Sequence, residues 1–375
     1  MSSLMREMGA RALRLGIPLS VQLDLTYRCN ERCVHCYLDH DDHGEMTTAE
    51  ILDLLGQMAE AGVFFLTLSG GEIFMRQDFF EILEHARKLM FCVKLKSNAV
   101  MVRAAGAERL RDLAIDSVQV SIYSHRAEVH DGITKLPGSL KRSLEGARLL
   151  VGKGVKVIFA NVLMRQNLAD YQGVRALASE MGAEFRIDPT ITPMMDGDRS
   201  ILSLGIDQSA LREVFRNEDL VGNVEEFCAP PKGPMTAEDA LDTVPCSAGH
   251  TACYVSPYGD VYPCVQFPLP SGSVRRTRFV DIWRHSPELN EVRSISLGDL
   301  QGCSQCVHQD GCTRCPGLAY MEGNMRGPSI QDCEKSFART GVPSVNLQSK
   351  KSSTPGLVQI RLIPTAARVT SPAYS

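Results

Sequence analysis

The segment Cys29-Asn-Glu-Arg-Cys33-Val-His-Cys36 places three thiols within eight residues, directly after a short apolar run at residues 21–25. Three thiolates on one short loop can hold a cubane iron–sulfur cluster and leave its fourth iron open. An open iron suits a reactive cluster, because a fully ligated cluster only relays electrons. The alternative is a structural zinc loop completed by His35 or His40, although zinc loops usually carry CxxC pairs. The spacing therefore favours a cluster.

The composition is that of a globular protein, with 375 residues, 44% hydrophobic and 22% charged residues, and a net charge of -4. This length predicts two or three structural units. The absence of a long basic run argues against a nucleic-acid-binding surface. No apolar stretch approaches the ~20 residues that cross a bilayer, and the N-terminus lacks the continuous apolar segment of a secretory signal. We therefore expect a cytoplasmic protein without a nucleic-acid or membrane partner.

The chain has 13 cysteines, which is high for a long chain without an export signal. In a reducing compartment such thiols are better explained as metal ligands than as disulfides. Besides the three in the first loop, eight lie between Cys246 and Cys333. Cys92 and Cys228 stand apart from both groups, and we expect them to be ordinary thiols.

Short β-rich runs alternate with helical spacing along the first half of the chain. The expected strands lie at residues 21–25, 64–68, 92–96, 117–122, 155–161 and 184–188, and apolar residues at helical spacing occur at 51–58 and 140–151. Thr47, three residues before Glu50, indicates a capping box. This alternation predicts a parallel sheet with right-handed crossovers. Periodicity alone leaves open an open doubly wound sheet or a partial barrel.

The regular alternation ends near residue 200. One helix is expected near residues 207–215, and residues 246–333 are rich in cysteine and glycine with few periodic segments. Such a region cannot build a core from apolar area alone, so metal centres are expected to supply its folding energy. Residues 341–375 hold four basic residues and no acidic one. We expect this tail to be mobile, with residues 358–363 able to add a strand on docking.

The first cysteine segment resembles the signature of the radical S-adenosylmethionine (SAM) superfamily, which is CxxxCxxC followed by an aromatic residue, here Tyr37. Ser69-Gly70-Gly71-Glu72, at the end of the second expected strand, is similar to that family's GGE motif, although Ile73 stands where proline is frequent. A glycine pair lets the backbone approach a ligand closely. The resemblance covers residues 18–200 and implies a partial (β/α)6 TIM-like barrel.

The resemblance also implies the site and its chemistry. Cys29, Cys33 and Cys36 would bind a [4Fe–4S] cluster, and SAM would be cleaved reductively to methionine and a 5′-deoxyadenosyl radical that takes hydrogen from a substrate. Glu72 would accept a hydrogen bond from the SAM amino group, and Tyr37 would lie by the adenine. The implied SAM contacts are Tyr37, Ser69, Gly70, Gly71, Glu72, Asn98 and Ser121. For Ser97-Asn98 a simple turn, and for Ser121 a small residue in the barrel lumen, remain the alternatives.

The eight later cysteines resemble the SPASM domain, the C-terminal module of radical SAM enzymes that mature peptides and proteins. Their last spacing in the run is x2 rather than the family's x3. The resemblance implies two auxiliary [4Fe–4S] clusters, one bound by Cys246, Cys253, Cys264 and Cys315. The other would be bound by Cys303, Cys306, Cys312 and Cys333. Two structural zinc ions are the alternative.

These features imply a division of the chain into five parts. Residues 1–17 form an N-terminal extension and 18–205 the barrel. Residues 206–245 form a linker with a helix, 246–340 a small cysteine-rich iron–sulfur domain, and 341–375 the tail.

The resemblance implies an enzyme that modifies a ribosomally made peptide or protein by crosslinking, epimerisation or oxidation. The alternatives are a radical SAM step in small-molecule cofactor biosynthesis, of the molybdopterin, haem or quinone-cofactor kind, and a cluster-bearing electron carrier. Val265 after Cys264, where sulfatase-maturing relatives have aspartate, disfavours that activity. Only 28 residues precede Cys29, so we expect a separate leader-peptide-binding protein. A flavodoxin- or ferredoxin-type reductant is expected as well.

The sequence assigns no catalytic base. Tyr123 and His125 follow the fourth expected strand and could face the barrel mouth, where active sites of this architecture lie. Arg165 could pair with the SAM carboxylate, or it could be a solvated surface residue. His35 is expected to be a spacer within the cysteine loop.

Overall fold

The computed structural model describes residues 3–234, 243–309, 311–344 and 346–347. The strand expected at 358–363, and most of the expected tail, lie outside these ranges. Within them, no helix combines the length and the apolar character needed to cross a membrane.

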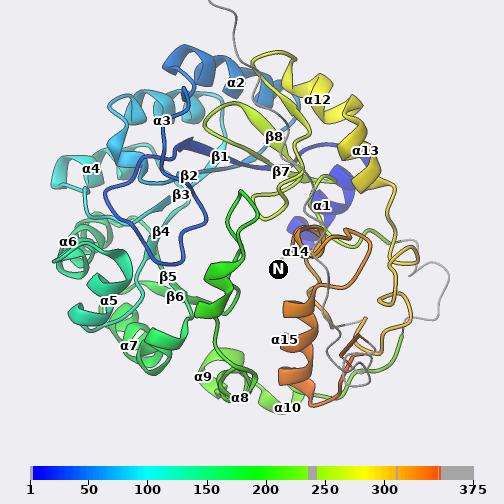
Figure 1. Ribbon diagram of the computed structural model, residues 1–375. Coiled ribbons are helices and arrows are strands. Elements are labelled where there is room, and N and C mark those ends of the chain that lie inside the picture. Colours follow the sequence, from blue (N-terminus) through cyan, green and yellow to red (C-terminus); the bar gives the residue numbers. More distant parts are fainter. Residues whose placement is uncertain (1–2, 235–242, 310, 345, 348–375) are drawn as a thin grey trace, which may run out of the picture.

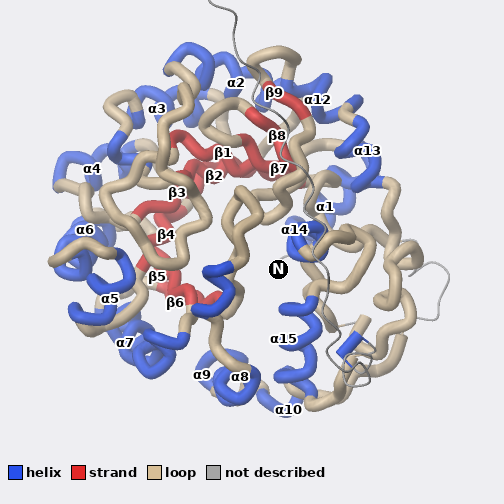
Figure 2. Tube along the Cα trace, in the orientation of Figure 1, coloured by secondary structure: helices blue, strands red, loops and turns tan. Residues whose placement is uncertain are grey.

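A nine-stranded sheet runs through the molecule in the order β6-β5-β4-β3-β2-β1-β7-β8-β9. Every pairing from β6 to β7 is parallel, and β8 and β9 are antiparallel additions. The sheet curves inside a ring of helices (Figures 1 and 2). This is the partial barrel that the sequence implied. The strands are β1 Ser20–Thr26, β2 Phe65–Gly70, β3 Cys92–Ser97, β4 Ser117–Ser121, β5 Val157–Val162, β6 Glu184–Asp188, β7 Ala252–Val255, β8 Asp260–Tyr262 and β9 Gly272–Ser273.

Helices follow the barrel strands in turn and cover their outer face (Figure 1). The capping box predicted at Thr47 and Glu50 is present and begins the helix after β1. The helix expected near residue 207 is also present, capped by Asp207. The longer helices are α1 Ser3–Leu15, α2 Thr48–Glu60, α3 Phe79–Lys88, α4 Ala104–Asp112, α5 Ala127–Thr134, α6 Ser139–Gly152, α7 Tyr171–Glu180, α8 Gln208–Val214, α12 Phe279–His285, α13 Pro287–Arg293 and α15 Ile330–Thr340. Three short ones are α9 Glu218–Val221, α10 Val224–Phe227 and α14 Pro316–Met321.

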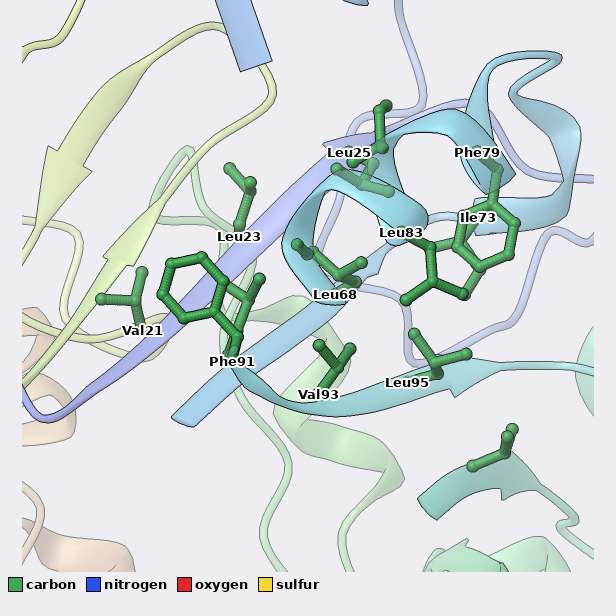
Figure 3. Close-up of a cluster of buried hydrophobic side chains, with 14 of the residues drawn as sticks. Val21, Leu23, Leu25, Leu68, Ile73, Phe79, Leu83, Phe91, Val93 and Leu95 are labelled. Carbon is green, nitrogen blue, oxygen red and sulfur yellow. The ribbon is translucent and has the colours of Figure 1, made fainter. Parts of the chain in front are cut away.

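The main core lies between the strands and this helical layer. Leu23, Leu68 and Leu95 are fully buried on neighbouring strands and belong to one apolar cluster with Phe79 and Leu83 of α3, as Figure 3 shows. Side chains alternate along a strand, so the residues between these leucines point to the opposite, inner face. On β1 the inner residues are Gln22 and Asp24. The strands thus present an apolar outer face and a polar lumen.

The cysteine-rich region contributes to the same sheet. β7 pairs with β1 in parallel register, Ser20 opposite Ala252 and Leu23 opposite Val255. Trp283 of α12 is buried, and its indole N–H donates to the carbonyl of Gly16 at 2.6 Å. The expected boundary near residue 246 therefore divides the sequence, while the sheet continues across it.

Candidate active site

A cavity of about 440 Å³ opens at the carboxyl ends of the barrel strands. Its walls come from the three-cysteine loop, from residues at the ends of β2 to β6, and from Val265 and Gln266 of the cysteine-rich region. In barrels of this kind the carboxyl ends of the strands are where active sites lie. The cavity is therefore the candidate active site.

The three thiols of the first loop all line this cavity. The loop is tied to the end of α5, because the amides of Arg32 and Val34 donate to the carbonyls of Thr134 and Ile133 at 2.9 and 3.0 Å. Burial raises the pKa of Cys29 to about 12 and also raises the pKa values of Cys33 and Cys36.

Such thiols stay protonated unless a metal centre stabilises their anions. Two buried polar atoms beside them, Oε1 of Glu31 and Nδ1 of His35, have no hydrogen-bond partner in the described chain. Both residues line the cavity. The donor set and the unpartnered polar atoms fit a bound cluster with a polar ligand.

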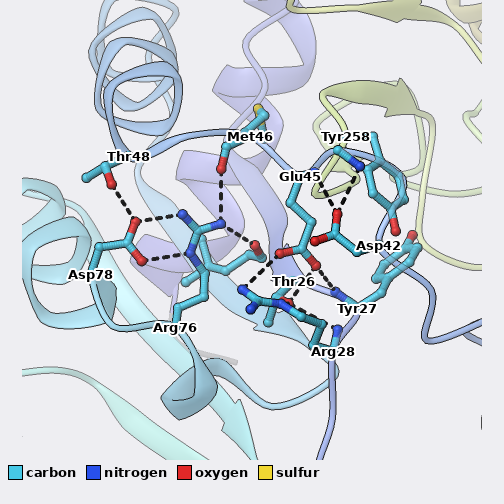
Figure 4. Close-up of polar contacts among 12 residues, drawn as sticks. Thr26, Tyr27, Arg28, Asp42, Glu45, Met46, Thr48, Arg76, Asp78 and Tyr258 are labelled. Atoms are coloured by element: carbon cyan, nitrogen blue, oxygen red, sulfur yellow. Dashed lines mark hydrogen bonds and ion pairs between the residues drawn. The ribbon is translucent and has the colours of Figure 1, made fainter.

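A polar network holds the chain where it leaves β1 and enters the loop (Figure 4). Glu45 accepts hydrogen bonds from Thr26 Oγ1 at 2.6 Å and from the amide of Tyr27 at 2.8 Å. Arg76 donates to the carbonyls of Leu25 and Met46, at 2.9 and 3.1 Å. Asp78 accepts from the same guanidinium at 2.6 Å, and this interaction lowers the pKa of Asp78 to about 2. This polar network therefore holds the backbone in place at the start of the cysteine loop.

Gly70 and Gly71 line the cavity, but their backbone is pressed against the chain itself. A β-carbon at Gly71 would lie 2.3 Å from the carbonyl oxygen of Arg28. Gly70 has a φ of 128°, which side-chain-bearing residues rarely adopt, and a β-carbon there would meet the carbonyl of Thr26. The glycine pair is thus required for the close packing of β2 against the start of the cysteine loop. The sequence predicts that this close approach is made to a ligand, whereas in the structure it is made to the carbonyls of Thr26 and Arg28.

Glu72 does not line the cavity, which differs from the expected SAM contact. Its carboxylate is completely buried and accepts from Ser97 Oγ at 2.9 Å and from the amide of Asn98 at 2.8 Å. It also accepts from the amide of Phe74 at 3.1 Å. Burial raises its pKa, and these three donors oppose that rise. In this geometry Glu72 ties the end of β2 to the end of β3.

The other residues implied as SAM contacts come together around the cavity. Tyr37, Ser69, Asn98 and Ser121 all line it. Asn98 also reaches the cysteine loop, because its Nδ2 donates to Oδ1 of Asn30 at 2.8 Å. The turn after β3 therefore supports the loop as well as the cavity wall.

The structure separates the residues whose roles were left open. Tyr123 lines the cavity, and its ring meets that of His35 edge-on at 4.7 Å. His125 is exposed and lies outside the cavity wall, where its ring packs beside Gly173. Arg165 points away and donates to the carbonyl of Gly205 at 2.7 Å. His35 was expected to be only a spacer, yet it lines the cavity.

Sequence reasoning missed several polar side chains that line the lumen. Lys96 on β3, Gln119 on β4 and Asp188 on β6 line the cavity from within the strands, and Gln266 lines it from the segment between β8 and β9. Gln119 and Ser121 show the signal that could have found them, which is a polar residue at every second position of a strand whose other residues are apolar. In a sheet covered by helices, the polar face must point into the lumen.

Cys303, Cys306, Cys312 and Cys333 surround one small cavity of about 50 Å³. Burial and then the other thiols raise the pKa of Cys303 to about 11. The structure thus brings together the four residues implied for one auxiliary cluster, from two loops and the start of α15.

The other four of the eight later cysteines are Cys246, Cys253, Cys264 and Cys315. Burial is the main cause of the raised pKa values of Cys253 and Cys264, and Cys264 adds to the rise at Cys253. The charge of Cys246 contributes in the same way to the raised pKa of Cys264, and the charge of Cys264 contributes to the raised pKa of Cys315. The Cys315 thiol also lies 3.9 Å from Oε1 of Gln266, which lines the large cavity. This second set therefore borders the candidate active site.

Nowhere in the described ranges do three histidine, cysteine, aspartate or glutamate side chains converge closely enough to hold one metal ion. The thiolates of a cubane bind different iron atoms and lie further apart than the ligands of one tetrahedral zinc.

Comparison with known proteins gives two family matches. The radical SAM superfamily profile matches residues 23–178, and the SPASM iron–sulfur cluster-binding domain matches residues 246–316. Relatives include the AdoMet-dependent heme synthase of Methanosarcina barkeri, 27% identical over 81% of this chain and 92% of that protein. The PqqA peptide cyclase of Xanthomonas campestris is 29% identical over 92% of this chain and 94% of that protein.

Among solved structures, Streptococcus suis SuiB bound to its precursor peptide SuiA matches with a TM-score of 0.68. The match covers 87% of this chain and 79% of SuiB at 17% identity, which shows a shared fold. The two family matches show that the chain carries a radical SAM domain followed by a SPASM iron–sulfur cluster-binding domain, and that it is an enzyme that uses [4Fe–4S] clusters and SAM.

Proposed function

We propose that this enzyme abstracts hydrogen from a ribosomally made peptide or protein and so modifies it. The observation that carries the proposal is one cavity with two different walls. The three-cysteine loop forms one wall, and Gln266, which contacts Cys315, forms part of the other. A substrate between them would lie next to both a hydrogen-abstracting centre and an electron acceptor.

The ligands follow from this arrangement. Cys29, Cys33 and Cys36 bind the cluster that meets SAM. Auxiliary clusters are bound by the set Cys246, Cys253, Cys264 and Cys315 and by the set Cys303, Cys306, Cys312 and Cys333. One small cavity is lined by all four cysteines of the set that begins with Cys303, and this supports the division. In the other set, Cys246 and Cys264 contribute to the raised pKa values of their partners, which supports it as well. The division between a catalytic barrel at 18–205 and a cluster domain at 246–340 is proposed on the same basis.

Tyr37, Ser69, Gly70, Gly71, Asn98 and Ser121 are the proposed SAM contacts, because they line the cavity beside the three thiols. Glu72 is a positioning residue in this proposal, since its buried carboxylate accepts from Ser97, Asn98 and Phe74 and does not line the cavity. When bound, the cluster and SAM supply the hydrogen-abstracting 5′-deoxyadenosyl radical. The chain's own part is to orient both reactants and to exclude water.

A peptide substrate is supported by the PqqA peptide cyclase, which matches nearly the full length of this chain. We also propose a cytoplasmic location, a flavodoxin- or ferredoxin-type reductant and a separate protein that binds a leader peptide. The second candidate is a step in small-molecule cofactor biosynthesis, which the AdoMet-dependent heme synthase relative favours.

The test uses anaerobically purified and reconstituted protein. We expect about twelve iron atoms per chain, from three four-iron clusters, and 5′-deoxyadenosine after SAM and dithionite are added. The variant Cys33→Ala should lose deoxyadenosine formation, whereas Cys92→Ala, which removes a thiol outside the cavity, should keep it. Zinc instead of iron, or no deoxyadenosine from the wild type, would overturn the proposal.

The substrate class is tested with the same preparation. Peptides translated from short reading frames next to the gene are compared with a propionate-bearing tetrapyrrole. A SAM-dependent mass change in a peptide supports the leading proposal. A change in the tetrapyrrole alone supports the second candidate and overturns the first.

A further inference from the structure

The lumen of the barrel carries a row of polar side chains at one level of the sheet. Asp24 on β1 lies opposite Ser69 on β2, and Lys96 on β3 lies opposite Gln119 on β4. Lys96 is the basic residue of this row. It is half-buried, and its side chain lines the cavity of the candidate active site. A cation in such a place needs a partner, since an unpaired charge away from bulk water is costly.

The described part of the chain gives Lys96 one hydrogen bond and no ion pair. Its ammonium donates to Oε1 of Gln22 at 3.0 Å. Asp24 is the nearby acid, but its oxygens accept from Gln22 Nε2 and from the hydroxyl of Tyr254, each at 3.0 Å. An ammonium has three N–H donors, so Lys96 keeps donors for a ligand in the cavity.

Lys96 lines the cavity together with Val265 and Gln266, which form the wall contributed by the cysteine-rich region. SAM must reach the open iron at the loop of Cys29, Cys33 and Cys36. Burial lowers the pKa of Lys96, and Asp24, Cys264 and Asp188 oppose this fall. A substrate that lies between the cysteine loop and the wall formed by the cysteine-rich region would share the cavity with Lys96.

Asp188 completes the charge pattern of the cavity. It lines the same cavity from β6, and its Oδ1 accepts from the amide of Thr190 at 2.8 Å. The cavity therefore has a cation on β3 and two carboxyl groups, Asp188 on β6 and Glu31 in the cysteine loop. A ligand with one carboxylate would be oriented by these groups, with its carboxylate at Lys96 and away from Asp188 and Glu31.

We propose that Lys96 is a substrate-binding residue that holds a carboxylate of the substrate, such as an acidic side chain of a peptide, against the wall formed by the cysteine-rich region. This inference rests on the proposed function for the identity of the substrate. It adds the chemical class of the group that is recognised. A carboxylate would pair with the ammonium through a charge-assisted hydrogen bond.

The test is protection of Lys96 from acetylation in the reconstituted enzyme, measured by peptide mass spectrometry. The probes are Ac-Ala-Glu-Ala-amide and Ac-Ala-Gln-Ala-amide, which differ by one carboxylate. We expect the glutamate peptide to slow acetylation of Lys96 about tenfold, as a charge-assisted bond would, and the glutamine peptide to have little effect. Lys94 on the same strand is exposed and does not line the cavity, so it is the internal control.

Equal protection by the two peptides, or none by either, would overturn the proposal. Protection by SAM alone would also overturn it, since the carboxylate would then be that of SAM. In a second measurement, Lys96→Met should bind SAM as the wild type does but lose the preference for the glutamate peptide, and Lys96→Arg should restore it. Lys94→Met should behave as the wild type.

The two proposals fail separately. If deoxyadenosine were not formed but Lys96 were still protected, only the proposed function would fail. If deoxyadenosine were formed and Lys96 showed no carboxylate preference, only this inference would fail.

Discussion

The barrel and the last part of the cysteine-rich region are stabilised in different ways. The core of the barrel is a continuous set of buried apolar residues that runs from Val21 to Ala178, and it also takes in Val255 of β7 and Trp283 of α12. Around the cysteines the apolar cluster is small, with Ala248, Phe267 and Val292 as its buried members. There the buried space is lined by thiols instead.

This difference bears on where the barrel ends and the cysteine-rich region begins. β7 and α12 belong to the cysteine-rich part of the sequence but pack on the barrel core. Residues 294–347, by contrast, hold four of the cysteines around one small cavity. Packing on the main apolar core therefore continues past residue 246 as far as Leu289.

The largest expected effect is that of removing iron. Structural metal sites contribute on the order of 10 kcal/mol to folding, so chelation should unfold residues 294–347 and leave the barrel folded. Hydrogen exchange measured by mass spectrometry should show loss of protection in α15 and retention in β1 to β5. Uniform loss of protection across both regions would contradict the comparison.

The second effect concerns the junction between the two regions. The hydroxyl of Tyr254 on β7 donates to Asp24 on β1 at 3.0 Å, and burial raises the pKa of Asp24 to about 6 from 3.8. The folded protein thus holds this proton to a higher pH than the unfolded chain. Stability from this group is present below pH ~4 and falls as the pH rises to about 6, by on the order of 3 kcal/mol.

The measurement is the thermal unfolding midpoint at pH 5 and at pH 7. We expect the wild type to lose stability between these values relative to Asp24→Asn, which has no charge at either pH. If the unfolding midpoints of the wild type and of Asp24→Asn changed by the same amount between pH 5 and pH 7, Asp24 would not titrate in this range.

The smallest effect is at the glycine pair. Gly71→Ala places a β-carbon 2.3 Å from the backbone oxygen of Arg28, which cannot move as a flexible side chain would. We expect a loss of about 1–3 kcal/mol in stability together with reduced iron in the first cluster. Gly56→Ala in α2 is the matched control, because a β-carbon there meets nothing within 4 Å.

The control should be neutral or stabilising by about 0.4–1 kcal/mol. Denaturant unfolding measures the stability of both variants, and iron analysis measures how much of the first cluster each one holds. If Gly71→Ala kept full iron and stability, the close packing of β2 against the cysteine loop would not be needed.

Much of the fold could be predicted from the sequence because it depends on local patterns. The six barrel strands lie where the apolar runs occur, and the Thr47 capping box is formed. The role of β7 could not be predicted, because Ala252–Val255 is a four-residue strand whose partner, β1, is more than 200 residues away. Short strands carry little periodicity, and nothing local fixes their partner.

Some features of the candidate site could likewise be predicted from the sequence, and others could not. The sequence by itself determined which thiols are grouped in the first loop, since Cys29, Cys33 and Cys36 are held together by chain connectivity. Only the tertiary structure decided that Glu72 turns toward Ser97 and Asn98 and that Lys96 faces the cavity. The direction of a side chain in a barrel depends on the register and curvature of the whole sheet, which no single segment of the sequence contains.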